Sequence, residues 1–145
     1  MELHDCLVYL LAKSSQAGYR FWTSYISSYN VTPVQAMVLI LLNREDGVSA
    51  KKLGEQTQLD SATITGVLDR LEGMDLIIKK KNPADRRAIL ISLSEKGRND
   101  AKELDELFEK AHNDFLNEFT DEEEVQLRTL LKRVLETHKY HLFSK

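Results

Sequence analysis

Two adjacent arginines, Arg86 and Arg87, follow Asp85 in a polar segment between two β-prone stretches. A guanidinium group on a thin projecting element can enter a narrow minor groove of DNA, where negative potential is concentrated. Asp85 is near enough to Arg87 to hold its side chain extended. A run of lysines precedes this segment and would contact phosphates, which adds affinity and salt dependence but no sequence information: Lys79, Lys80 and Lys81. The pattern predicts duplex DNA as the ligand.

The segment before these lysines, from Ser61 to Met74, predicts an amphipathic helix with one small, polar face. Gly66 lies near the centre of that face, although glycine within a helix costs about 1 kcal/mol relative to alanine. A small residue would let the helix axis approach the major groove, whereas the alternative is close helix packing inside the protein. The helix N-terminus also offers free N–H groups to phosphate. The residues expected to face DNA here are Ser61, Ala62, Thr63, Thr65, Gly66 and Arg70.

Charge is distributed unevenly along the chain, whose formal net charge is −3. The stretch Leu76–Arg98 holds seven basic and two acidic residues, a net charge of +5, so the rest carries −8. A basic segment on an acidic body is compatible with DNA binding, because the position of the positive charge matters more than its total. The alternative is that the lysines only form a solvated surface.

Hydrophobic periodicity, capping residues and turns predict a mainly α fold with a small β-hairpin. Thr32-Pro33-Val34-Gln35 and Thr120-Asp121-Glu122-Glu123 have the composition of capping boxes at helix starts. The expected elements are a long helix to about Tyr29, a buried helix from Thr32, a short helix 49–57, a tight break at 58–60, the helix from Ser61, a two-stranded hairpin 77–81 and 89–93, a long helix from Ser94 and a last helix after Thr120. This order is that of a winged helix-turn-helix with long terminal helices.

Other classes of function leave no signature in the 145 residues. We find no glycine-rich phosphate loop, nucleophile elbow or metal-binding motif, and therefore expect no enzyme, no cofactor and no metal. The longest apolar run, Ala36 to Leu42, is too short to cross a bilayer. One cysteine, Cys6, precludes a disulfide within the chain, and the acidic start does not resemble a secretory signal. These features favour a cytoplasmic protein.

The segment from Leu59 to Gly97 resembles the multiple-antibiotic-resistance regulator (MarR) family. The similarity is clearest in Leu71-Glu72-Gly73-Met74-Asp75-Leu76-Ile77 and in the run from Asp85 to Gly97, an Asp-x-Arg followed by alternating apolar residues and Ser-x-x-Gly. The resemblance implies that Arg87 is the minor-groove residue and Asp85 its brace. Asp75 stands where the family usually has glycine, and aspartate tolerates the left-handed conformation needed there.

The resemblance also implies a homodimer built from the terminal helices, which reads a palindromic operator with two recognition helices and two wings. A physical argument agrees, because the long apolar-striped helices exceed what a small DNA-reading module can cover. We therefore expect residues 1–31 and 98–145 to form the dimerisation region and residues 32–97 the DNA-binding region. The alternative is a monomer with a helical cap.

Many regulators that the chain resembles release DNA when they bind a small aromatic or anionic molecule, or when a thiol is oxidised. The first helix is rich in aromatic residues, and an effector site is expected at Tyr9, Arg20, Trp22 and Tyr25, unless these residues form core or dimer interface. Cys6 is the candidate for thiol-based peroxide sensing, although no cationic residue adjoins it. The primary expectation is a repressor released by an effector; the alternatives are a peroxide-sensing repressor and a winged-helix adaptor for protein contacts.

Overall fold

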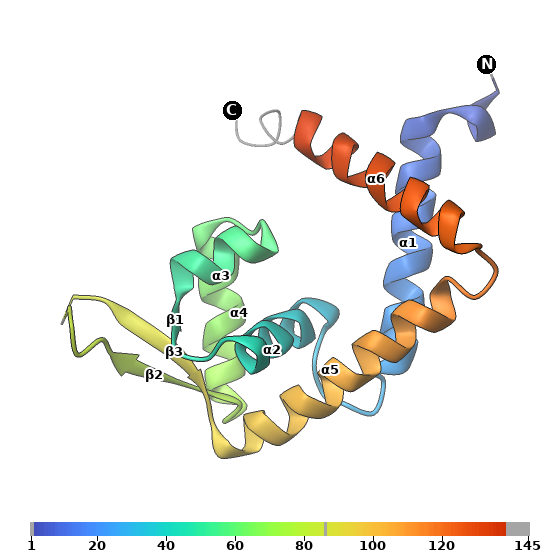
Figure 1. The fold of residues 1–145 in the computed structure, drawn as a ribbon. Helices are drawn as coiled ribbons and strands as arrows, with labels where there is room; N and C mark the ends of the chain where they lie inside the picture. Colours follow the sequence, from blue (N-terminus) through green and yellow to red (C-terminus); the bar gives the residue numbers. More distant parts are fainter. Residues whose placement is uncertain (1, 86, 139–145) are drawn as a thin grey trace. The chain divides into compact units, whose positions relative to one another are not determined.

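The computed structural model describes residues 2–85 and 87–138, which divide into two compact units between Ala111 and His112. A short 3₁₀ helix, Leu3–Asp5, comes first (Figure 1). The helices are α1 (Leu7–Tyr25), α2 (Pro33–Arg44), α3 (Ala50–Thr57), α4 (Ser61–Gly73), α5 (Glu95–Phe115) and α6 (Asp121–His138), and the strands are β1 (Val48–Ser49), β2 (Ile77–Lys81) and β3 (Ile89–Leu93). The mainly α winged helix-turn-helix fold expected from the sequence is confirmed.

The helix starts are fixed by the capping residues that the sequence contains. Thr32 and Gln35 form a complete capping box at α2, where Pro33 occupies the first turn. The Ser49 side chain accepts a hydrogen bond from the backbone N–H of Lys52 at the start of α3. Caps of this kind contribute about 1 kcal/mol each, because they satisfy N–H groups that have no partner within the helix.

The break between α3 and α4 is a left-handed residue, Gln58, with φ of 57°. Gly54 in α3 permits the close approach of the following turn, since a Cβ there would lie 3.2 Å from the carbonyl oxygen of Leu59. α3 and α4 therefore form a tight helix-turn-helix, and the hairpin of β2 and β3 follows directly from α4 (Figure 1).

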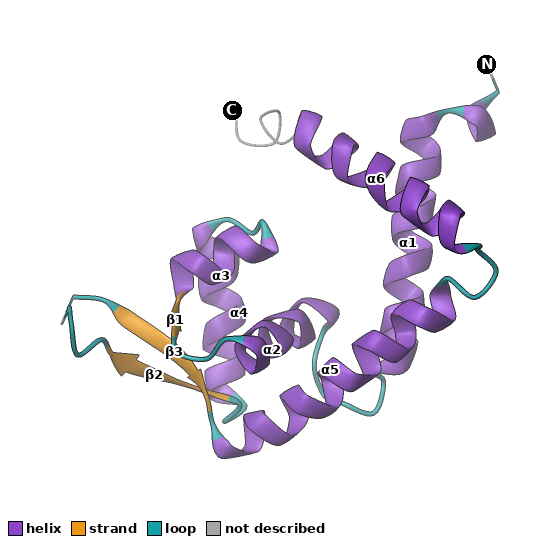
Figure 2. Cartoon of the chain, in the orientation of Figure 1, coloured by secondary structure: helices purple, strands orange, loops and turns teal. Residues whose placement is uncertain are grey.

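The sheet has three strands, in the order β1-β3-β2, where the sequence analysis expected a two-stranded hairpin (Figure 2). β1 is antiparallel to β3, with Val48 opposite Ile91 and Ser49 opposite Leu90. A strand of two residues is too short to show the alternating pattern by which a strand is predicted. Because β1 leads into α3, this pairing ties the base of the wing to the helix-turn-helix.

One core lies beneath the helix-turn-helix and the base of the wing, and α2 is its central helix. Leu39, Leu42, Leu53 and Leu71 are each 0% exposed. Burial of a leucine side chain contributes about 1.5–3 kcal/mol, so this cluster holds α2, α3 and α4 together. α4 therefore rests on a packed hydrophobic core.

The first helix is shorter than expected and ends at Tyr25 rather than near Tyr29. Ile26 is its C-cap, and the hydroxyl of Ser27 donates to the carbonyl of Ser24, a local bond that competes with helix continuation. At the other end Cys6 has extended backbone angles and separates α1 from the 3₁₀ helix. The aromatic residues of 1–31 are thus divided between α1 and the segment that leads into α2.

The start of α5 crosses the turn that follows α4. Ser94 donates its hydroxyl to the carbonyl of Asp75 at 2.5 Å and accepts from the N–H of Gly97 at 2.9 Å. The carbonyl of Leu76 accepts from the Ser94 N–H at 3.0 Å. Asp75 has φ of 58°, the left-handed conformation expected at this position. We name these residues, Asp75, Leu76, Ser94 and Gly97, the crossing.

The second unit contains the end of α5 and the whole of α6. Thr120 and Glu123 form the capping box predicted at the start of α6, with bonds of 2.9 and 3.3 Å. Phe119 lies outside α5, which ends four residues earlier, at Phe115. Several large apolar residues of α6 are exposed in the single chain: Val125, Leu130, Leu131, Val134 and Leu135.

In residues 2–85 and 87–138, no helix combines the length and apolarity needed to cross a membrane.

Candidate nucleic-acid interface

The outer face of α4 is formed by small and polar residues, as the sequence predicts. Ile64, Leu68 and Leu71 are buried on the opposite side. Six residues of α4 that were expected to face DNA are all exposed: Ser61, Ala62, Thr63, Thr65, Gly66 and Arg70. The structure thus brings the predicted reading residues onto one exposed surface of a single helix.

Gly66 has open space around it. A Cβ built at this position meets no heavy atom within 4 Å beyond its own helix and its chain neighbours. Close packing of this glycine against another element, the alternative explanation, is therefore not found among residues 2–85 and 87–138. The open surface at Gly66 is compatible with the close approach to DNA that the sequence analysis expected.

The two threonines of this face each donate their hydroxyl proton within the protein. Thr63 donates to Oδ2 of Asp60 at 2.8 Å, and Thr65 donates to the carbonyl of Ser61 at 2.7 Å. Hydrogen bonds from the backbone and side chain of Thr63 hold the pKa of Asp60, the N-cap of α4, below its ordinary value. In this state both threonine oxygens keep a lone pair, so they can accept from base amino groups, while their methyl groups can contact thymine.

The wing tip is a tight, polar turn. The Asn82 side chain accepts from the N–H of Ala84 at 2.9 Å, and the Asp85 carboxylate accepts from the N–H of Arg87 at 3.0 Å. Asp85 thus fixes the backbone that presents Arg87, whereas the sequence analysis expected it to act on the side chain. Arg87 is exposed, and Arg86 lies outside the described residues.

The three consecutive lysines differ in their surroundings. Lys80 and Lys81 are exposed, as expected for residues that reach phosphate. Lys79 is different, because its Nζ lies 2.7 Å from a carboxylate oxygen of Asp69 and 2.7 Å from one of Glu72. The sequence analysis assigned Lys79 to phosphate contact and gave no role to the two acids, whose spacing of three residues on α4 was the available signal.

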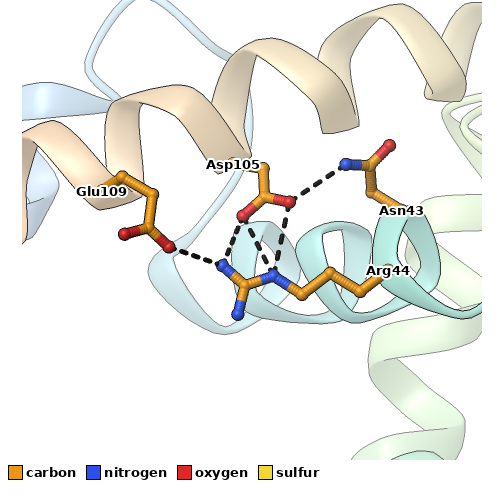
Figure 3. Close-up of polar contacts among 4 residues, drawn as sticks. All are labelled: Asn43, Arg44, Asp105 and Glu109. Atoms are coloured by element: carbon orange, nitrogen blue, oxygen red, sulfur yellow. Dashed lines mark hydrogen bonds and ion pairs between the residues drawn. The ribbon is translucent and has the colours of Figure 1, made fainter.

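Arg44 joins α2 to α5 through a cluster of polar contacts (Figure 3). Its Nη2 lies 2.6 Å from Oδ1 of Asp105 and 3.0 Å from Oε1 of Glu109, and Asn43 donates to the other oxygen of Asp105 at 3.0 Å. The hydrogen bond from Arg44 is the main cause that lowers the pKa of Asp105. The ring of Phe108 lies 5.9 Å from the guanidinium carbon of Arg44. The sequence analysis missed this cluster, which joins the end of α2 to α5.

The four residues expected to bind an effector differ in their surroundings. Trp22 is half-buried and packs edge-on against Phe108 at 5.5 Å, so it contributes to the packing of α1 on α5. Arg20 is exposed and lines a surface hollow of about 290 Å³ with Ser15, Gln16 and Tyr19. Tyr9 and Tyr25 lie roughly 24 Å apart along α1, at 1.5 Å per residue, and are both half-buried.

A larger cleft of about 570 Å³ lies beside α4. It is lined by the end of the α1–α2 connection, the start of α2 and the end of α4: Tyr29, Asn30, Val31, Thr32, Gln35, Arg70, Gly73 and Met74. Tyr29 donates to a Glu103 oxygen at 2.5 Å, and that bond is the main cause that raises the pKa of Tyr29 to about 12.

Cys6, the redox candidate, is half-buried at the N-cap of α1.

The helix α4 exposes small and polar residues, a tight turn precedes it and a basic hairpin follows it. This arrangement defines a winged helix-turn-helix transcriptional regulator. Comparison with known proteins agrees. The MarR family profile matches residues 31–89. The chain is 38% identical over 97 residues to the organic hydroperoxide resistance transcriptional regulator of Bacillus subtilis, an alignment that covers 67% of this chain and 66% of that regulator. It is 33% identical over 109 residues to the regulator SarZ of Staphylococcus aureus, across 75% of this chain and 74% of SarZ.

Solved structures share the fold over nearly the whole chain. Bordetella bronchiseptica BpsR, described with regulation of its DNA binding by 6-hydroxynicotinic acid, has a TM-score of 0.84 at 25% identity and covers 92% of this chain and 96% of its own. A mutant MarR from E. coli complexed with operator DNA has a TM-score of 0.81 at 26% identity, across 89% and 93%. The chain belongs to the MarR family of transcriptional regulators, and these regulators are not enzymes.

Proposed function

We propose that the chain is a cytoplasmic, homodimeric repressor that binds a palindromic operator and is released by a small aromatic or anionic effector. The observation that carries this proposal is the open surface around Gly66 on α4, next to a basic wing in the same compact unit. α4 would enter the major groove and Arg87 the adjacent minor groove. The E. coli relative complexed with operator DNA supports this use of the fold.

The dimer rests on apolar side chains that the single chain leaves exposed. In the first unit these are Leu3, Leu7, Val8, Leu10 and Leu11, and the second unit exposes five more on α6. A soluble chain rarely exposes that many large apolar side chains unless a partner covers them. A second copy would cover them and place two recognition helices about one DNA turn apart. On this proposal 1–31 and 98–145 dimerise and 32–97 bind DNA.

A footprint on the DNA upstream of its own gene, combined with sedimentation of the free protein, tests the proposal. We expect a symmetric protected site and a species of twice the mass of the chain. Addition of aromatic acids should remove the protection. A protein that bound no duplex, or bound every duplex equally at all salt concentrations, would contradict DNA reading and favour the protein-contact adaptor.

Arg87→Ala should weaken operator binding by about 1–3 kcal/mol, the range for one base or minor-groove contact. Its guanidinium group is exposed in the described structure, so the fold should be unaffected. Fluorescence anisotropy at fixed salt measures the affinity, and thermal unfolding is the control. Unchanged affinity would remove the wing from the mechanism.

A peroxide-sensing repressor is the second candidate, because the chain is 38% identical to an organic hydroperoxide resistance regulator. Cys6 would then be the sensing thiol. If so, peroxide should release DNA from the wild type and not from Cys6→Ser, measured by anisotropy, while an aromatic acid should release both. Equal release of both proteins by peroxide would exclude the thiol.

A further inference from the structure

Lys79 on β2 is bonded to two carboxylates of the recognition helix. Its Nζ lies 2.7 Å from Oδ1 of Asp69 and 2.7 Å from Oε2 of Glu72. The two acids are three residues apart on α4, so they lie side by side on its surface. We name these three residues the wing bridge. It connects the two elements that the proposed function places in adjacent grooves.

The geometry leaves Lys79 little capacity for another ligand. An ammonium group has three donors, and two are directed at carboxylates here. Only 26% of the Lys79 side chain is exposed. The hydrogen bonds to Asp69 and then Glu72 raise the pKa of Lys79, so the group stays charged.

Lys80 and Lys81 provide the contrast. Both are exposed, and within residues 2–85 and 87–138 neither forms an ion pair. Successive residues of a strand point to opposite faces, so Lys80 is directed away from the face that Lys79 occupies. Among the described residues, Lys79 is thus the lysine of the run that is paired with acids of α4.

The two acids also need an explanation. Carboxylates on a helix that approaches phosphates repel the ligand, and Lys79 offsets only part of their charge. Their presence is understandable if they hold the wing in register with α4. We infer that Lys79 is a positioning residue, which acts on DNA through Asp69 and Glu72 by fixing the wing relative to the recognition helix, and not a phosphate contact. The inference rests on the proposed function, since it concerns how that site is aligned.

The test compares two duplexes at several salt concentrations: a palindrome that the wild type selects from a randomised library, and a scrambled duplex of the same composition. Lys79→Met should lose about tenfold in affinity for the palindrome and much less for the scrambled duplex. Lys79→Arg, which can still bridge two carboxylates, should recover most of the loss. Lys80→Met, the matched variant, should weaken both duplexes and lower the salt slope by about 0.9, as expected for one phosphate contact.

A second set of variants tests whether the carboxylates of Asp69 and Glu72 mainly repel DNA or mainly position the wing. Asp69→Asn combined with Glu72→Gln removes two negative charges near DNA, so simple electrostatics predicts tighter binding, whereas the wing bridge predicts a loss of about tenfold on the palindrome. In this background Lys79→Met should cause no further loss, because its partners are already gone. Melting temperatures within about 2–4 °C of the wild type would show that the fold is retained.

Two results would overturn the inference. One is a further loss from Lys79→Met in the Asp69→Asn, Glu72→Gln background together with a lower salt slope, which would make Lys79 a phosphate contact. The other is a tighter palindrome complex in the Asp69→Asn, Glu72→Gln protein. A wild type without preference for any duplex would instead overturn the proposed function, which is a separate outcome.

Discussion

Gly97→Ala is expected to cause one of the largest losses of folding stability of any single substitution in this chain. A Cβ at this position would lie 1.8 Å from the carbonyl oxygen of Leu76 and 2.8 Å from its carbonyl carbon. Both are backbone atoms, and the oxygen already accepts the N–H of Ser94 at 3.0 Å, so they cannot move without separating α5 from α4. We expect a loss of about 3–5 kcal/mol, a large part of the roughly 5–15 kcal/mol that holds a domain folded.

Chemical denaturation with a circular dichroism readout measures this loss. Gly73→Ala is the matched control, because a Cβ there meets nothing within 4 Å. It replaces glycine with alanine at the end of α4 and should be neutral or stabilising by up to about 1 kcal/mol. Equal stability of the two variants would show that the crossing can relax, and that close approach at Gly97 is dispensable.

Gly66→Leu should reduce binding of the preferred duplex to the level of non-specific DNA. The open space around Gly66 accepts a leucine in the free protein, so the side chain should clash only when the helix surface approaches base edges. The selectivity between a preferred and a scrambled duplex, measured by anisotropy at one salt concentration, should disappear, while weak binding through phosphates persists.

Gly66→Ala distinguishes an effect on folding stability from an effect on selective DNA binding. It should raise stability by about 1 kcal/mol, because alanine favours the helix, and it should reduce selectivity less than leucine does. If Gly66→Leu instead unfolded the protein, the glycine would be needed for folding rather than for binding DNA.

The sequence predicts well the features that depend on neighbouring residues. The capping boxes at Thr32 and Thr120 and the polar turn after Lys81 are local, and each is found where it was expected. The outward position of Gly66 follows from the spacing of Ile64, Val67 and Leu68. These residues form the apolar face of the helix that packs on the core, so Gly66 on the other side faces outward.

Features that depend on distant partners could not be predicted. β1 exists because Val48 pairs with Ile91, 43 positions along the chain, and two residues carry no periodic signal. The charge of Lys79 is evident from the sequence, but its partners on α4 are determined by how the hairpin folds back. Arg44 meets Asp105 because α2 packs on α5, and the spacing of residues along the sequence does not predict this packing.

The crossing has a mechanical consequence for the proposed release by an effector. Hydrogen bonds and a glycine contact without room for a methyl group join the turn after α4 to the start of α5, so we expect a rotation of α5 to carry α4 with it. A molecule that rotates α5 would then alter the angle at which α4 enters the major groove of DNA. The backbone hydrogen bonds within α4 would stay intact. Amide exchange in α4 should accordingly stay slow in the released state, and induction would be a change of pose rather than of folding.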